Sequence, residues 1–246
     1  MSQSYSKWLR VLALTGWIFA GFFSASFLTS GLFFFLTTVG IDFNTLNSNV
    51  LSTATAAVLY LCTLLIVIGL PWLVREKKTT LKDVGLDRLM SWLDIFITPL
   101  GLIVYLLLSA FLVYFASKYI PWFDTNQAQD TGFERLNQQY EFYLAFITLV
   151  IIAPVAEEAL FRGYMFGNLK KMVPTWAAIL VTSLLFGIFH GAWNVGVDTF
   201  ALSIVLCLLR EITGGIWSSI LLHMTKNGIA FYILFLNPTL LTTLGG

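Results

Sequence analysis

Long stretches without a charged side chain are the feature that most limits how this chain can fold. No Asp, Glu, Lys or Arg lies between Arg10 and Asp42, and two further gaps of the same kind follow. Each gap exceeds the roughly 20 residues that a helix needs to cross about 30 Å of hydrocarbon, where a charge is costly. The gaps predict membrane-spanning helices near residues 11–39, 50–74 and 95–117.

The composition supports a membrane protein and argues against other classes. Hydrophobic residues make up 58% of the 246 residues and charged residues 11%, whereas soluble domains average about 45–50% and 25%. These values exclude a disordered chain and a disulfide scaffold, and they argue strongly against a soluble enzyme. The formal net charge of +1 offers no basic surface for nucleic acid, so we expect no nucleic-acid partner.

The second half of the chain is apolar too, but each of its apolar runs contains or adjoins a charge or a histidine. These runs lie near residues 142–168, 174–191, 198–212 and 215–236. With the first three spans they predict an all-α, polytopic transmembrane bundle of about seven helices. We expect a single integral-membrane domain over residues 1–246, with N-terminal helices and loops in 1–140 and a functional core in 141–236.

The polar segments between the spans predict the topology. Most of the 14 Lys and Arg residues fall on one side when the N-terminus is cytoplasmic, as the positive-inside rule requires. We therefore expect a multi-pass protein of the cell membrane with its N-terminus inside. The polar stretch 119–140 predicts an exposed loop. Residues 79–93 fit either an interfacial helix or a solvated loop.

Two adjacent acids, Glu157 and Glu158, stand inside an apolar run. Glu158 and Arg162 are four residues apart with the acid first, which places them on one helix face in the favourable order for an ion pair. Glu157 is rotated by about 100° and needs another partner or a wet cavity. Pro154 should kink this helix and free a carbonyl one turn earlier. The alternative interpretation is a Glu–Arg pair that only staples the bundle, with Glu157 exposed at the edge.

Both histidines of the chain lie in apolar segments, each four residues from a partner on the same predicted helix face. His190 follows Phe186, and His223 precedes Asn227. A lone buried histidine is more often a satisfied core residue than a catalyst. Two histidines, two glutamates and an asparagine on three apolar helices point instead to a functional site.

The chemistry open to this set is hydrolysis by activated water. The chain has no G-x-S-x-G elbow and no H-E-x-x-H motif. A glutamate in a low-dielectric cavity suits a general base, a histidine can share its proton, and a second histidine with an asparagine amide can stabilise an oxyanion. Alternatively, Glu157, His190 and His223 supply three ligands with an open fourth position, as in catalytic zinc sites.

Three motifs in order resemble the CPBP family of intramembrane proteases, the CAAX-processing and bacteriocin-processing enzymes also called the Abi family. The family's Glu-Glu-x-x-x-Arg motif stands at 157–162, its Phe-x-x-x-His motif at 186–190 and its His-x-x-x-Asn motif at 223–227. Each motif alone is weak evidence, but the ordered set is specific. The resemblance covers roughly residues 140–230, and residues 1–140 match only as generic membrane helices.

The resemblance implies a division of roles among six catalytic-site residues. Glu157 and His190 would activate water, His223 and Asn227 would form the oxyanion site, and Glu158 and Arg162 would orient the cluster. We favour the metal-free mechanism, without a cofactor, because asparagine is a poor zinc ligand. A divalent zinc site on Glu157, His190 and His223 stays an alternative.

The expected activity is endopeptidase cleavage in or near the bilayer, with membrane lipids and a peptide or membrane-protein substrate as partners. Substrate identity and oligomeric state are left open by the sequence. A proton-coupled transporter is an alternative, since intramembrane Glu and His residues also build proton relays. However, the chain shows no inverted repeat of the kind transporters often have. A catalytically silent membrane scaffold is a third interpretation.

Overall fold

The computed structural model describes residues 2–75, 78–125, 127, 131–133 and 136–239. Every regular element within these ranges is helical. Five helical segments are long and apolar enough to cross a membrane: Ser6–Thr38, Ser48–Val74, Trp92–Tyr119, Gln139–Leu169 and Trp217–Leu236. The chain is a polytopic, all-helical, multi-pass membrane protein, as the charge-free gaps predicted.

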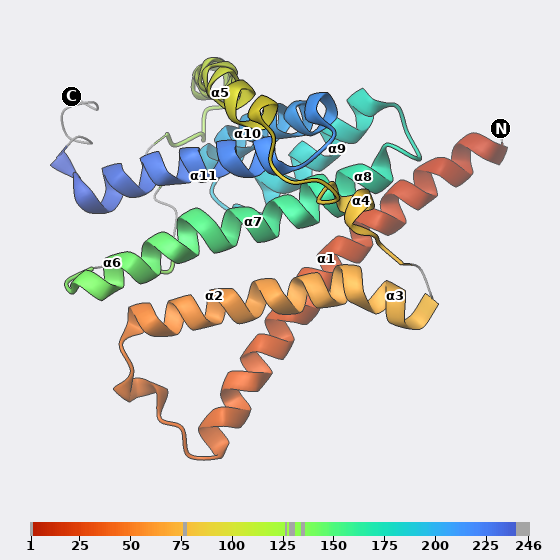
Figure 1. Ribbon diagram of the computed structural model, residues 1–246. Helices are drawn as coiled ribbons and strands as arrows, with labels where there is room; N and C mark the ends of the chain where they lie inside the picture. Colours follow the sequence, from red (N-terminus) through yellow and green to blue (C-terminus); the bar gives the residue numbers. More distant parts are fainter. Residues whose placement is uncertain (1, 76–77, 126, 128–130, 134–135, 240–246) are drawn as a thin grey trace. The chain divides into compact units, whose positions relative to one another are not determined.

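The element labels follow Figure 1. The α-helices are α1 (Ser2–Thr38), α2 (Ser48–Leu64), α3 (Leu70–Arg75), α4 (Leu81–Val84), α5 (Trp92–Tyr119), α6 (Gln139–Phe146), α7 (Ala153–Glu158), α8 (Phe166–Leu169), α9 (Thr175–Ile188), α10 (Trp193–Thr213) and α11 (Trp217–Phe231). A 3-10 turn, η1, covers Phe43–Thr45. Segments with π-helical hydrogen bonding are η2 (Leu65–Gly69), η3 (Ile147–Ile152), η4 (Ala159–Met165) and η5 (Tyr232–Leu236).

The chain divides into two compact units, each described here by itself. Unit 1 comprises Met1–Leu12, Thr80–Asp130 and Glu158–His223. Unit 2 comprises Ala13–Thr79, Thr131–Glu157 and Met224–Gly246.

Unit 1 is organised around α10, which packs against both α9 and α5 (Figure 1). Buried apolar residues recur along α10 at helical spacing, which gives it a continuous apolar stripe. Its core cluster contains Tyr105, Ala201, Leu202, Val205, Leu206, Leu209 and Leu222. A Cβ on Gly187 would lie 2.6 Å from the carbonyl oxygen of Gly196. Glycine at position 187 is therefore what lets α9 approach α10 so closely.

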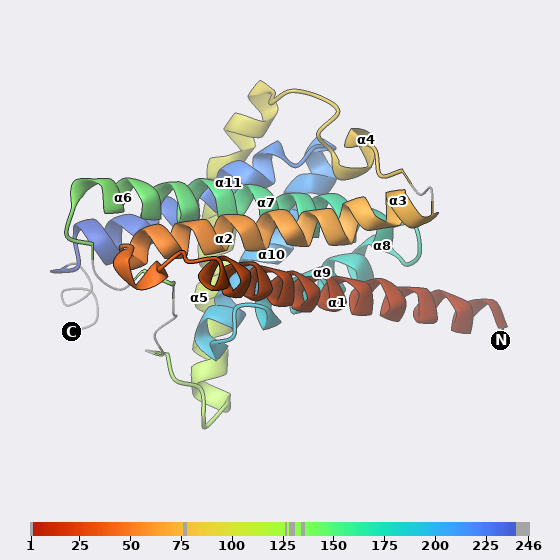
Figure 2. The same ribbon diagram turned by 90° about the horizontal axis from the view of Figure 1, so that it is seen from below.

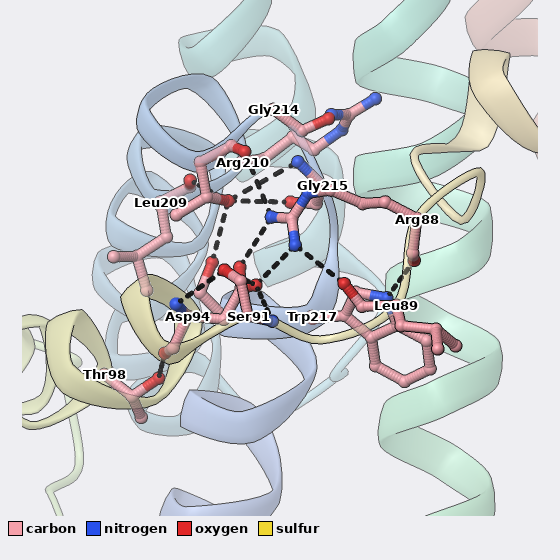
Figure 3. A network of polar contacts seen from close by, with 12 residues as sticks. Arg88, Leu89, Ser91, Asp94, Thr98, Leu209, Arg210, Gly214, Gly215 and Trp217 are labelled. Atoms are coloured by element: carbon pink, nitrogen blue, oxygen red, sulfur yellow. Dashed lines mark hydrogen bonds and ion pairs between the residues drawn. The ribbon is translucent and has the colours of Figure 1, made fainter.

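A polar network at the start of α5 joins the loop before it to the turn between α10 and α11 (Figure 3). Asp94 is fully buried and caps α5 together with Ser91. The Arg88 guanidinium binds both Asp94 oxygens, at 2.5 and 2.8 Å, and also donates to the Thr213 carbonyl at 3.0 Å. Trp217 Nε1 donates to the Arg88 carbonyl at 2.8 Å. These bonds fix the ends of α5, α10 and α11 relative to one another.

Unit 2 contains α2, which lies beside α6 and η3. Figures 1 and 2 both show α2 alongside α6. Asn47 Nδ2 donates to Glu141 Oε1 at 2.5 Å, which ties the start of α2 to the start of α6. Trp17 Nε1 donates to the Val67 carbonyl at 3.0 Å, inside the π-helical segment η2. Its core cluster of buried residues is Phe133, Ala145, Val150 and Phe231.

Sequence and structure differ mainly at element boundaries. The run predicted as 198–212 is the longer helix α10, because Tyr105 and Ser109 hydroxyls donate to Asp198 Oδ1, at 2.7 and 2.5 Å, and satisfy this acid inside the helix. The helix predicted over 174–191 ends at Ile188, before Gly191 with φ +74°. Within the described residues, α9 and α10 together with the five candidate spans make seven long helices, in agreement with the predicted number of about seven.

The two predicted polar segments are now assigned as far as the structure describes them. In 79–93 only Leu81–Val84 is helical before α5 begins at Trp92, so most of this segment is the loop alternative. The predicted loop 119–140 lies between α5 and α6, which end and begin at Tyr119 and Gln139. Residues 126, 128–130 and 134–135 of that loop lie outside the described residues.

Candidate active site

The ion pair expected from four-residue spacing is present in unit 1 and has a third member. Arg162 Nη1 donates to Glu158 Oε1 at 2.8 Å. His223 Nδ1 lies 2.8 Å from the same oxygen. Glu158 and Arg162 are fully buried, and His223 is 3% exposed. One buried oxygen of Glu158, in α7, thus contacts both Arg162 of η4 and His223 of α11.

This cluster is incompletely hydrogen-bonded. Among the described residues, Glu158 Oε2 and Arg162 Nε and Nη2 are buried without a nitrogen or oxygen partner. The Arg162 guanidinium stacks over the Phe186 ring at 4.2 Å, and the Cys207 thiol is its other polarisable neighbour. Native proteins leave few buried polar atoms without partners, and such atoms mark strain, a catalytic role or bound water.

His190 sits in the turn after α9 rather than on the helix. It is half-buried, and its ring centroid lies 4.8 Å from that of Phe186. Its Nδ1 lies 2.7 Å from the Phe186 carbonyl. The Phe186 ring also meets His223 edge-on at 5.8 Å. Phe186 therefore contacts both histidines and Arg162, which explains physically why an aromatic residue belongs in this motif.

The partners of the two histidines fix how each ring is protonated. A carbonyl only accepts hydrogen bonds, so His190 Nδ1 carries a proton, and in the neutral ring Nε2 is an acceptor. When Glu158 is ionised its oxygens only accept, so His223 Nδ1 then donates to Glu158. His223 can donate from Nε2 as well only when the ring is an imidazolium.

Gly163, directly after Arg162, is required by packing. A Cβ at this position would lie 2.9 Å from Val84 Cβ and 3.0 Å from the Val84 carbonyl oxygen. The short helix α4 therefore rests directly on the backbone of η4. Gly163 connects the buried cluster to the loop segment that precedes α5.

Glu157 belongs to unit 2, where its partner comes from α2. The Tyr60 hydroxyl donates to Glu157 Oε1 at 2.6 Å, and Glu157 is half-buried. Glu157 was predicted to need another partner or a wet cavity, and the partner is Tyr60, which was not predicted. The span Ser48–Val74 holds this one tyrosine among several serine and threonine hydroxyls, so the sequence offered no signal that selects it.

Asn227, also in unit 2, satisfies a carbonyl that Pro154 leaves without a donor. In η3 the hydrogen bonds run from residue i+5 to residue i, as from Ala153 N to Thr148 O. The next bond would run from residue 154 to Leu149 O, and proline has no N–H. Asn227 Nδ2 donates to Leu149 O at 2.9 Å instead. Pro154 does free a carbonyl in the preceding turn, as predicted, and one amide proton of Asn227 is committed to it.

The zinc alternative requires three ligand side chains close enough to hold one ion. Both histidines have Nδ1 in a hydrogen bond, as metal-ligating histidines do when they bind through Nε2. Within the described residues, however, no group of three His, Cys, Asp or Glu side chains lies in an arrangement that could hold a metal. The zinc alternative takes its ligands from both units and stays a prediction.

Comparison with known proteins places this segment among relatives. Residues 139–229 match the family described as Type II CAAX prenyl endopeptidase Rce1-like. An uncharacterized 24.3 kDa protein of Escherichia coli is 33% identical over 95 residues, which cover 36% of this chain and 44% of that protein. UPF0177 protein YxdF of Lactococcus lactis is 29% identical over 136 residues, covering 53% of this chain and 68% of that protein.

No solved structure matches the chain. The family match begins and ends within two residues of the segment that carries the three motifs in the sequence analysis, which was given as roughly 140–230. The resemblance to the CPBP family of CAAX proteases, predicted from those motifs, is confirmed for residues 139–229.

Proposed function

We propose that this protein is an intramembrane endopeptidase that hydrolyses a peptide bond in or near the bilayer with activated water. The observation that carries the proposal is the buried, incompletely paired cluster of Glu158, Arg162 and His223 in a segment that matches a CAAX endopeptidase family. A purely structural pair would be expected to satisfy its polar atoms. A substrate or a reacting water would use those that are left.

Glu157 is the general base in this proposal, and His190 assists it. The Tyr60 hydroxyl donates to one Glu157 oxygen and orients the carboxylate, which takes the proton from water. The His190 imidazole accepts from the same water or later passes a proton to the leaving amine. Water oxygen adds to the carbonyl carbon, the C–N bond breaks, and the amine leaves with the transferred proton.

His223 and Asn227 form the oxyanion site in the proposal. An imidazolium His223, anchored by Glu158, donates from Nε2 to the developing oxyanion, and the second amide proton of Asn227 adds another donor. A well-placed donor of this kind contributes roughly 3–4 kcal/mol to transition-state stabilisation. Glu158 and Arg162 act as positioning residues, because Glu158 binds His223 Nδ1 and Arg162 in turn holds Glu158. No step is assigned to a metal ion.

The substrate class follows from where the site lies. Its residues belong to helices that span the membrane or adjoin such spans, so the substrate is a membrane-associated peptide or membrane protein. We also propose that the protein resides in the cell membrane with its N-terminus in the cytoplasm, on the distribution of its basic residues.

The test compares membrane proteomes of cells that carry the wild type or Glu157→Gln. The glutamine side chain keeps the size and hydrogen bonding of glutamate but cannot accept a proton, so we expect uncleaved substrate to accumulate while the variant stays folded. Asp42→Asn is the matched control, because Asp42 caps the exposed turn η1 and makes the same carboxylate-to-amide change. Identical proteomes for wild type and Glu157→Gln would contradict the proposal and favour a silent scaffold.

A further inference from the structure

A pocket in unit 1 is lined mainly by charged side chains, most of them basic, and the proposed protease chemistry does not use it. It has a volume of about 380 Å³, and its lining includes Lys82, Asp83, Phe166, Lys170, Lys171 and Arg210. The four cations come from three separate segments: α4, the turn after α8, and the end of α10. The fold, rather than a run of basic sequence, therefore gathers them.

Among the described residues, the acids at this pocket form ion pairs with only two of its four cations. Lys171 Nζ pairs with Asp83 at 3.0 Å, and Lys170 pairs with Glu211. Hydrogen bonds from the Thr80 hydroxyl and backbone N–H, with the Lys171 ammonium, hold the pKa of Asp83 well below its usual range, so this acid is ionised at neutral pH. Within the described ranges, no carboxylate forms an ion pair with Lys82. Positive charge is left over.

Arg210 contributes the other cation without an ion pair. It donates to the Gly214 carbonyl, and Gly85 leaves it room, since a Cβ there would lie 2.5 Å from the guanidinium carbon. Figure 3 shows Arg210 at the Gly214 turn. Glu211 and Asp87 attract Arg210 electrostatically, but neither is within ion-pair distance among the described contacts.

The pocket lies at the end of a candidate membrane span. The candidate span Gln139–Leu169 ends one residue before Lys170. Two large apolar side chains next to the pocket-lining segments, Leu81 and Trp176, are 64% and 66% exposed. Exposed tryptophan and apolar residues beside lysines are typical of the membrane interface. Basic pockets of this kind at helix ends bind anionic headgroups.

We propose that this pocket binds a phosphate-bearing anion, either the headgroup of an anionic phospholipid or a soluble phosphate. The anion's oxygens would be held by Lys82 and Arg210, with Lys170 and Lys171 adding to the field. The ligand would sit directly beside α4, which rests on Gly163. Binding would therefore stabilise the packing of α4 against η4. The proposal is independent of the protease proposal, because it needs no cleavage.

The experiment titrates the full-length protein in detergent with dioleoyl phosphatidylglycerol and, separately, dioleoyl phosphatidylcholine. Thermal unfolding and native mass spectrometry report binding. We expect phosphatidylglycerol to raise Tm and to be retained, and phosphatidylcholine to do neither. Inorganic phosphate forms the third arm: if it binds as tightly as the lipid, the ligand is soluble phosphate, and if it is much weaker, the ligand is the headgroup.

Lys82 variants provide the decisive comparison, because Lys82 makes no ion pair that the fold would lose. Each basic charge near a membrane surface contributes about 1 kcal/mol, so Lys82→Gln should weaken anion binding about fivefold and Lys82→Glu about thirtyfold. Lys82→Arg should retain binding. Lys7→Gln is the matched control, since Lys7 is exposed and does not line the pocket.

Three results would overturn the proposal. The first is equal binding of the anion to wild type and Lys82→Glu. The second is a loss for Lys7→Gln as large as for Lys82→Gln, which would mean that overall charge alone attracts the anion. The third is no binding of either phosphatidylglycerol or inorganic phosphate to the folded wild type.

Discussion

Two arginine–carboxylate pairs in unit 1 are made of the same chemical groups but are completed differently. Asp94 is fully buried, and its two oxygens accept from Arg88 and from the backbone and hydroxyl of Ser91. Glu158 is equally buried, yet Arg162 reaches only one of its oxygens. The first pair is closed and joins helix ends. The second is open, and its spare atoms are what a functional cluster would keep for a ligand.

The largest expected effect is that of Arg162→Ala. It leaves the buried Glu158 with only His223 as a partner for charge, and breaking a buried pair in this way costs about 3–5 kcal/mol. We expect a markedly lower Tm in detergent and loss of cleavage. Arg162→Lys restores a charge but not the stacking on Phe186, and should recover only part of the stability. Wild-type melting of Arg162→Ala would contradict the role given to this pair.

Asp94→Ala should have a smaller effect, on stability alone. It removes the Asp94 half of the capping box at the start of α5 and a partner of Arg88, but the Arg88 side chain is 32% exposed and can turn to water. We expect a loss of about 2 kcal/mol, mostly from the cap. Cleavage per folded molecule should stay at the wild-type rate, measured at a temperature where both proteins are folded. A folded but inactive Asp94→Ala would remove the distinction between the two pairs.

The smallest expected effect concerns Cys207, the neighbour of Arg162. Cys207→Ser offers the guanidinium a better acceptor in a similar volume and should change the free energy of unfolding by less than about 1 kcal/mol. Cys207→Ala removes the polarisable group and should cost about 1–2 kcal/mol. Denaturation of both variants in detergent gives the comparison. Equal stability of the two would show that the sulfur does not support Arg162.

The sequence predicts local parts of this site well, because helix geometry alone decides them. Glu158 and Arg162 are four residues apart and do pair. The first three long helices also follow from the charge-free runs, since the cost of burying charge in lipid is large. Helix ends are predicted less well. The predicted run began at Asp198, whereas α10 begins at Trp193, because Tyr105 and Ser109 satisfy this acid inside the helix.

Contacts between distant segments could not be read from the sequence. His223 is 65 residues from Glu158, and sequence spacing related it only to Asn227. Tyr60 is 97 residues from Glu157, and nothing local distinguishes it from a tyrosine that faces lipid. The π-helical segments were also not predicted, because their hydrogen-bond pattern depends on packing rather than on composition. The joint action of Glu157, His190, His223 and Asn227 stays a prediction.

The missing amide hydrogen of Pro154 ties two distant positions together. Replacing this proline with alanine would return a donor to the backbone, and the Leu149 oxygen would no longer need a side chain. Asn227 would then lose its anchor and could rotate. The proline ring at position 154 thus determines how the Asn227 amide is oriented, 73 positions further along the chain.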